Sequence, residues 1–327
     1  MTGRNLRKLS LVPAAALWLA ASGAAAQTAE FGDWLAEFRV EAAQAGISPA
    51  VLDAALGNVK PIPRVIELDR KQPESTQTFE EYLARRVTAD LAREGRRLLD
   101  KHRALLEAIG EEYGVQPRFI VALWGAETRY GKYTGGFSVI ASLATLAHDG
   151  RRSKYFRGEL LNALRIIDAG HITADQMTGS WAGAMGQSQF MPSSFLNYAV
   201  DYDGDQRRDI WGTHADIFAS AANYLAHAGW RDDQTWGRKA WLPDGFDPTL
   251  ADLGVVKRLG EWQALGVRRA DGSDLPARDL RASIIMPGGE DGPAYVIYDN
   301  YRAILKWNRS NYFGVSIGTL ADLIGNR

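Results

Sequence analysis

The chain has 327 residues, of which 46% are apolar and 24% are charged, and its formal net charge is -1. These values are ordinary for a soluble globular protein with one large core or two to three smaller ones. They give no sign of a protein that binds nucleic acids through charge. The chain contains no cysteine, so we expect no disulfide framework and no thiol that could carry a lipid anchor.

The first 26 residues have the pattern of a signal peptide. Three basic residues precede an apolar run over 9–21, and the alanines at 24–26 offer a cleavage site. The alternative is a membrane anchor, but the run is short and Pro13 interrupts it, which favours secretion. We therefore expect a soluble mature protein without stable membrane insertion, located in a bacterial periplasm.

The mature chain is predicted to be mainly α-helical. Apolar residues at helical spacing over 31–38 and the pair Ser48-Pro49 indicate two early helices. A long amphipathic segment follows from about residue 78 to residue 109. Its arginine pairs, at 85–86 and 96–97, are interpreted as a solvated face.

The segment FIVALWGAETRYG contains the candidate catalytic residue. Pro117 and Gly131 are typical of the two ends of a helix, and an apolar stripe at helical spacing continues to Glu127. Desolvation and the negative end of the helix both disfavour the carboxylate anion. Glu127 should therefore have a raised pKa and act as a general acid near neutral pH. The alternative is a glutamate at the helix edge, paired with Lys132 or Arg129.

Residues 180–194, SWAGAMGQSQFMPSS, mix glycines, neutral hydrogen-bonding groups and apolar side chains. Ser180, Gln187 and Gln189 could supply polar partners for sugar hydroxyls beside flat apolar surfaces, as a saccharide cleft requires. The alternative is a buried turn in which the amides are satisfied within the protein.

An aspartate-rich segment follows. The carboxylates at positions 1, 3, 5 and 9 of an EF-hand-like loop are Asp201, Asp203, Asp205 and Asp209. Position 6 is Gln206 rather than glycine, and position 12 is Gly212 rather than glutamate, so Asp216 is a candidate for the closing carboxylate. Aspartates packed this closely repel one another without a cation. Bound calcium is therefore favoured over a solvated acidic turn.

The remaining chain changes in character. From residue 236 proline and glycine become frequent, and segments 283–287 and 294–298 are predicted as strands around a glycine-rich turn. From Tyr301 the pattern is helical again.

Several motifs, in their order and spacing, resemble the lytic murein transglycosylase B (MltB-type) family. They are GAETRYG around Glu127, AGAMGQSQFMPSS from Ala182, DYDGDQRRDIW from Asp201, AANYLAHAGW from Ala221 and the closing WNRSNYF; the early segments FGDWLAEFRVEAAQAGIS and VIELDRKQPE are similar too. The resemblance implies a mainly α fold in which a lysozyme-like helical core joins an N-terminal helical domain and a small β-containing insert. The expected ranges are 1–26 for the signal peptide, 27–112 for the N-terminal helical domain, 113–235 for the catalytic core with its EF-hand-like loop, 236–299 for the insert and 300–327 for a helical return to the core.

The resemblance also implies an enzyme, a carbon–oxygen lyase acting on peptidoglycan. It would cleave the β-1,4 bond between N-acetylmuramic acid and N-acetylglucosamine without water, leaving 1,6-anhydromuramic acid, with Glu127 as the single acid and then base. The implied substrate-binding residues are Ser180, Met185, Gln189, Tyr224, Asn308 and Tyr312, with Arg151 and Arg152 near the stem peptide. The implied ligands of a structural Ca²⁺ are Asp201, Asp203, Asp205, Asp216 and the backbone carbonyl of Arg207. We expect a monomer that acts on glycan strands with stem peptides and needs no organic cofactor.

Two other functions are considered. A hydrolytic muramidase needs a second carboxylate about 5–9 Å from the acid, and Asp149 and Glu159 are the nearby candidates. A non-catalytic, calcium-stabilised peptidoglycan-binding protein would not need Glu127. A catalytic role for calcium is disfavoured, because the aspartate loop lies too far along the chain to share the cleft.

Overall fold

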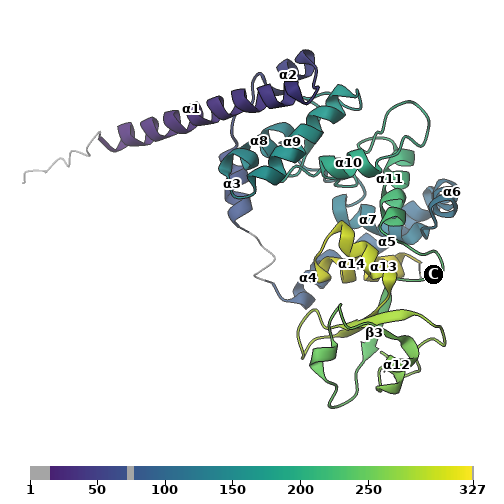
Figure 1. Ribbon diagram of the computed structural model, residues 1–327. Helices are drawn as coiled ribbons and strands as arrows, with labels where there is room; N and C mark the ends of the chain where they lie inside the picture. The colour runs from purple at the N-terminus through teal and green to yellow at the C-terminus, as the bar shows by residue number, and fades with distance from the viewer. Residues whose placement is uncertain (1–14, 72–76, 326–327) are drawn as a thin grey trace, which may run out of the picture.

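The structure is a computed structural model, and it describes residues 15–71 and 77–325. It is mainly α-helical, with the long helix α1 at one end and a small sheet with helix α12 at the other (Figure 1). The helices that precede the central helix are α1 (Ala15–Gln44), α2 (Pro49–Leu56), α3 (Pro63–Arg70), α4 (Phe79–Arg86), α5 (Ala89–Lys101) and α6 (Arg103–Tyr113).

The N-terminal helices follow the sequence pattern with one correction. Helix α2 begins at Pro49 as predicted, and the Ser48 hydroxyl caps it by accepting the Val51 N–H. The long amphipathic segment predicted over 78–109 is helical but is not one continuous helix, because it is divided among α4, α5 and α6. The Thr88 hydroxyl accepts the Leu91 N–H and caps the start of a new helix. The first N–H groups of a helix have no carbonyl partner within it, so a capping hydroxyl at this position marks a helix start.

The expected signal peptide is only partly covered. Residues 1–14 lie outside the described residues, and α1 continues through the expected cleavage point after Ala26. No helix within 15–71 or 77–325 is long and apolar enough to cross a membrane. The signal peptide and the cleavage point stay predictions.

The central helix α7 (Pro117–Thr128) is surrounded by the rest of the helical core. All residues from Phe119 to Gly125 are buried, and α14 packs against α7, α5 and α4. The other helices are α8 (Val139–Asp149), α9 (Ser153–Asp168), α10 (Pro192–Tyr198), α11 (His214–His227), α13 (Asp299–Trp307) and α14 (Asn311–Gly325). Two short strands, β1 (Phe137–Ser138) and β2 (Thr178–Gly179), pair antiparallel.

The C-terminal insert is a five-stranded antiparallel sheet of order β4-β6-β7-β3-β5. Its elements are β3 (Gly237–Trp241), a 3₁₀ turn (Pro248–Leu250), β4 (Lys257–Arg258), α12 (Leu259–Ala264), β5 (Arg268–Arg269), β6 (Arg281–Ile285) and β7 (Ala294–Ile297). Strands β6 and β7 confirm the two predicted strands within two residues. Side chains alternate along a strand, so Ile284 and Val296 pack in the insert's own core while Ile285 and Ile297 join the helical core. The sheet is thereby fixed to the helices on one face.

Two helical cores divide the rest of the chain. One contains the N-terminal residues from Phe31 to Val65 together with α8, α9 and α10. The other contains residues from Phe79 to Leu123 together with α11, α13 and α14. The segment expected as one N-terminal domain, 27–112, therefore contributes to both cores. The domain limits stay predictions.

Candidate active site

Helix α7 places Glu127 in its last turn, and the backbone then bends sharply. The helix begins at Pro117 as predicted, but it ends at Thr128, and Arg129, Tyr130 and Gly131 all have left-handed backbone angles (φ 48°, 62° and 80°). For a non-glycine residue this conformation costs about 1–2 kcal/mol. Two contributions offset this cost at Tyr130: its ring is buried, and its hydroxyl donates to the Leu91 carbonyl at 2.7 Å.

Glu127 has the raised pKa that the sequence predicts. Its carboxyl group is partly buried, and burial raises its pKa to about 7, against the opposing effects of a Trp307 hydrogen bond and the Arg86 charge. Neither Lys132 nor Arg129, the two alternative partners, forms an ion pair with Glu127 in the described part of the chain. Lys132 Nζ lies 3.9 Å from the Glu94 carboxylate instead. At this pKa the group is protonated in part of the molecules at neutral pH, as a general acid must be.

Trp307, at the end of α13, was not among the predicted site residues. Its indole Nε1–H donates to Glu127 Oε1 at 2.8 Å. Its ring lies against the rings of Tyr224 (4.8 Å between centroids) and Phe190 (5.2 Å). The only sequence signal was its position beside Asn308 in WNRSNYF, because the contact joins residues 180 positions apart.

A pocket of about 370 Å³ opens at the carboxyl group. Arg85, Arg86, Arg129 and Tyr133 line it together with Glu127, which is the only carboxylate among its described lining residues. Arg85 and Arg86 are exposed, as predicted. Both also border the candidate acid, which the interpretation as a solvated face did not include.

The loop that contains Ser180 and Gln189 is anchored beside this site. The Ser180 hydroxyl accepts the Ala184 N–H at 3.0 Å, and Gln189 Nε2 donates to the Thr134 carbonyl at 3.1 Å. Gln187 is a buried-turn amide, because it accepts from Trp124 Nε1 (2.7 Å) and donates to the Trp211 carbonyl (2.8 Å). Gln187 therefore fits the buried-turn interpretation, and saccharide binding by Ser180 and Gln189 stays a prediction.

The aromatic candidates contact residues that neighbour Glu127. Tyr224 contacts the Trp307 ring and donates its hydroxyl proton to the Lys306 carbonyl at 2.6 Å. Asn308 directly follows Trp307 and is exposed. On the other side, Tyr312 packs against Tyr82 (5.5 Å between ring centroids), over whose ring the Arg86 guanidinium lies.

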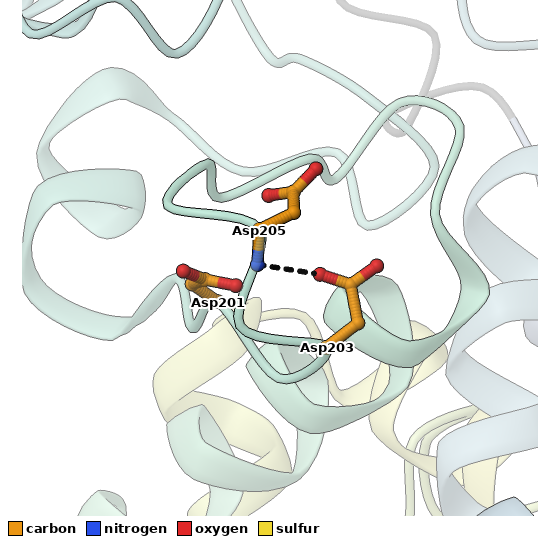
Figure 2. Close-up of side chains that lie close together, drawn as sticks. All are labelled: Asp201, Asp203 and Asp205. Atoms are coloured by element: carbon orange, nitrogen blue, oxygen red, sulfur yellow. Dashed lines mark hydrogen bonds between the residues drawn. The ribbon is translucent and has the colours of Figure 1, made fainter.

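The aspartate loop brings three of its carboxylates together. Asp201, Asp203 and Asp205 gather their carboxylates within 4.8 Å of one another, as Figure 2 shows. The Asp201 carboxylate also accepts the N–H groups of Gly204 and Gln206, each at 2.8 Å. Gln206 adopts a left-handed φ of 73°, the conformation for which EF-hand loops keep a glycine at this position. This departure from the motif therefore leaves the loop conformation intact.

Asp216 and Asp209 have different surroundings. The Asp216 side chain is fully buried, and its two oxygens accept the N–H groups of Tyr202 and Asp209, each at 2.7 Å. It joins the two ends of the loop but is not one of the three gathered carboxylates. Asp209 points away from them, because its carboxylate accepts the N–H groups of Trp211 and Gly212.

Comparison with known proteins decides the family. The model of the transglycosylase SLT domain family matches residues 30–322. The chain belongs to this family. It is 31% identical over 252 residues to membrane-bound lytic murein transglycosylase B of Escherichia coli K12; the alignment covers 74% of this chain and 66%, just under two thirds, of that protein.

Solved structures of similar proteins confirm the predicted mainly α, lysozyme-like fold. SltB3 from Pseudomonas aeruginosa, in complex with NAG-anhNAM-pentapeptide, has a TM-score of 0.87 and 44% identity, covering 90% of this chain and 79% of that one. Escherichia coli Slt35, in complex with calcium, has a TM-score of 0.77 and 26% identity, covering 89% and 92%.

Three of the expected site residues do not line the pocket at Glu127. Met185 is fully buried, because its backbone bridges Gly179 and Phe190 and its side chain points into the core, so its expected contact with substrate is wrong. Arg151 and Arg152 both form ion pairs with buried Asp69 and line a separate open pocket. Neither arginine borders the pocket at the candidate acid.

The two candidates for a second catalytic carboxylate are also engaged elsewhere. Asp149 pairs with Arg70 at 3.0 Å. Glu159 is buried and accepts the Ser193 N–H (2.8 Å) and hydroxyl (2.6 Å), which fixes the start of α10. Neither lines the pocket at Glu127.

Proposed function

We propose that the protein is a peptidoglycan lytic transglycosylase that cleaves the β-1,4 bond between N-acetylmuramic acid and N-acetylglucosamine. No water is added, and the product ends in 1,6-anhydromuramic acid. The observation that carries the proposal is the carboxyl group of Glu127. Its pKa is about 7, and it is the only carboxylate among the described residues that line its pocket. Family membership and the SltB3 complex with an anhydro-sugar fragment support it.

In the proposed reaction Glu127 acts twice. Protonated Glu127 donates to the bridging oxygen while positive charge develops at the anomeric carbon of muramic acid. The substrate's own 2-acetamido group stabilises that carbon, so no second protein carboxylate is needed. Ionised Glu127 then accepts the proton of the C6 hydroxyl as its oxygen closes on the same carbon.

Neighbouring groups support the intermediate state. The Trp307 N–H and the positive charge of Arg86 both favour ionised Glu127, the form that exists between the two proton transfers. Each acid or base step is worth about 10²–10⁴-fold in rate. Holding the C6 hydroxyl close to the anomeric carbon contributes further, because an intramolecular attack outcompetes a loose water.

A hydrolytic muramidase would require a second carboxylate within about 5–9 Å of the acid, and no described residue of the pocket supplies one. Mass spectrometry of fragments released from murein sacculi separates the two reactions, because the anhydro product is one water lighter. A hydrated reducing end as the first product would refute the transglycosylase. Full lytic activity in Glu127→Gln would refute any mechanism through this group.

We also propose that Ca²⁺ binds to the aspartate loop as a structural ion. Three carboxylates and the backbone carbonyl of Arg207 are hard oxygen donors of the kind calcium prefers, and the loop is already folded around them. The Slt35 complex with calcium supports this assignment. Calcium should raise the melting temperature of the protein, and a chelator should lower it while folded enzyme keeps its turnover. An unchanged melting temperature in chelator would contradict the proposal.

The proposal includes saccharide binding by Ser180, Gln189, Tyr224, Asn308 and Tyr312, and the contact of Tyr224 with Trp307, which donates to Glu127, supports it. The substrate would be reached in the periplasm after export.

A further inference from the structure

Three arginines surround one side of the pocket at Glu127. Arg85 and Arg86 come from the last turn of α4, and Arg129 comes from the residue that ends α7. These elements are distant in sequence but border the same pocket. The glycan itself carries no charge that would need three guanidinium groups.

The three arginines have few partners within the protein. Within the described ranges, Arg85 and Arg129 form no ion pair, and Arg86 donates only to the Ala126 carbonyl at 3.3 Å. In contrast, Arg151 and Arg152, the basic pair expected near the stem peptide, share the buried carboxylate of Asp69. The guanidinium groups of Arg85 and Arg129 are therefore available to bind an anion. Arg86, which also lies over the Tyr82 ring and near the Glu127 charge, adds positive charge beside them.

The backbone of Arg129 points to the same conclusion. A left-handed φ of 48° favours glycine or asparagine. The Arg129 side chain is exposed. Its side chain does border the pocket of the candidate acid.

We propose that Arg85, Arg86 and Arg129 form a subsite for the free carboxylates of the stem peptide. The proposal rests on the proposed function, since it places muramic acid beside Glu127. Muramic acid carries the peptide on its lactyl group, and the peptide's carboxylates are the anionic part of an otherwise neutral strand. Planar guanidinium groups match carboxylates by paired hydrogen bonds. The subsite would make the enzyme prefer strands that carry peptides.

The test compares two substrates for each variant. One is intact sacculi with stem peptides; the other is the same glycan after an amidase has removed them. The quantity measured is the ratio of kcat/KM for the two. Because the side chains are exposed, we expect a loss of about three- to fivefold in this ratio for Arg85→Gln or Arg129→Gln, and of about tenfold for the double variant. Arg85→Lys and Arg129→Lys should keep most of the wild-type ratio, because they keep the positive charge.

A matched control is Arg281→Gln, which removes an exposed guanidinium from β6 in the insert and should leave both rates unchanged. A second measurement uses Glu127→Gln protein, which binds without turnover. A disaccharide pentapeptide should bind about tenfold more weakly when both arginines are also replaced, and less so at high salt.

An unchanged ratio in the double variant would overturn the subsite. An equal loss on both substrates would also overturn it, because the arginines would then act on the glycan or on Glu127. Neither result touches the proposed function, which fails only if Glu127→Gln remains lytic or if the product is hydrated.

Discussion

Replacing Glu127 by glutamine should change stability in a pH-dependent way. Burial raises the pKa of Glu127 from an ordinary 4.5 to about 7. The folded protein therefore binds this proton more tightly than the unfolded chain, so its contribution to stability is complete below pH 4.5 and is lost as the pH rises through 7. Each pKa unit is worth about 1.4 kcal/mol, which gives an upper limit of about 3 kcal/mol. Glutamine is neutral at every pH, so the variant does not lose this stability as the pH rises.

The assay is urea unfolding of wild type and Glu127→Gln from pH 4.5 to pH 8.5. The two free energies of unfolding should be similar near pH 4.5, and the variant should be more stable by about 2–3 kcal/mol at pH 8. Glu111→Gln, which removes an exposed carboxyl from α6, controls for net charge. A difference that stays constant with pH would refute the argument, because Glu127 would then be ionised in the fold and unable to act as the acid.

Three further outcomes are expected. Trp307→Phe removes the donor that favours ionised Glu127, so the alkaline limb of kcat/KM against pH should move upward by roughly one unit, with about a tenfold lower maximum; an unmoved limb would contradict this. Asp205→Asn should abolish the stabilisation by calcium, about 2.7 kcal/mol at a hundredfold excess of Ca²⁺ over Kd, which is read as loss of the calcium-dependent rise in melting temperature, and it should not destabilise the calcium-free protein. Asp216→Asn should lower the melting temperature even in chelator, because one buried N–H loses its acceptor at a cost of about 1–3 kcal/mol; equal stability in chelator would show that Asp216 acts only through the ion.

Local signals in the sequence predicted most of the helices. Proline at the first turn and a capping hydroxyl at Ser48 mark starts that need no distant contact. The amphipathic pattern over 78–109 continued across the break at Thr88, since apolar spacing alone does not distinguish one helix from two that pack on the same core. The capping threonine was the available signal.

The site was predictable where its chemistry is local. Glu127 breaks an apolar stripe, and the aspartates follow a loop motif, so both could be found from spacing. Trp307, Arg85 and Arg86 have no such signal, because their importance comes from distant segments that meet at the end of α7. Met185 shows the reverse error, since its place in a motif did not reveal that its side chain is buried.

One acidic group can serve both proton transfers only if its environment stabilises each protonation state in turn. Burial of Glu127 in the last turn of α7 favours the protonated acid, while Trp307 and Arg86 favour the anion. The resulting pKa is about 7. Trp307 reaches Glu127 from α13, which follows the insert, and the insert is fixed to the helical core through Ile285 and Ile297. The balance at Glu127 therefore depends on α4 and α13, because these helices supply Arg86 and Trp307 from segments far from α7 in the chain.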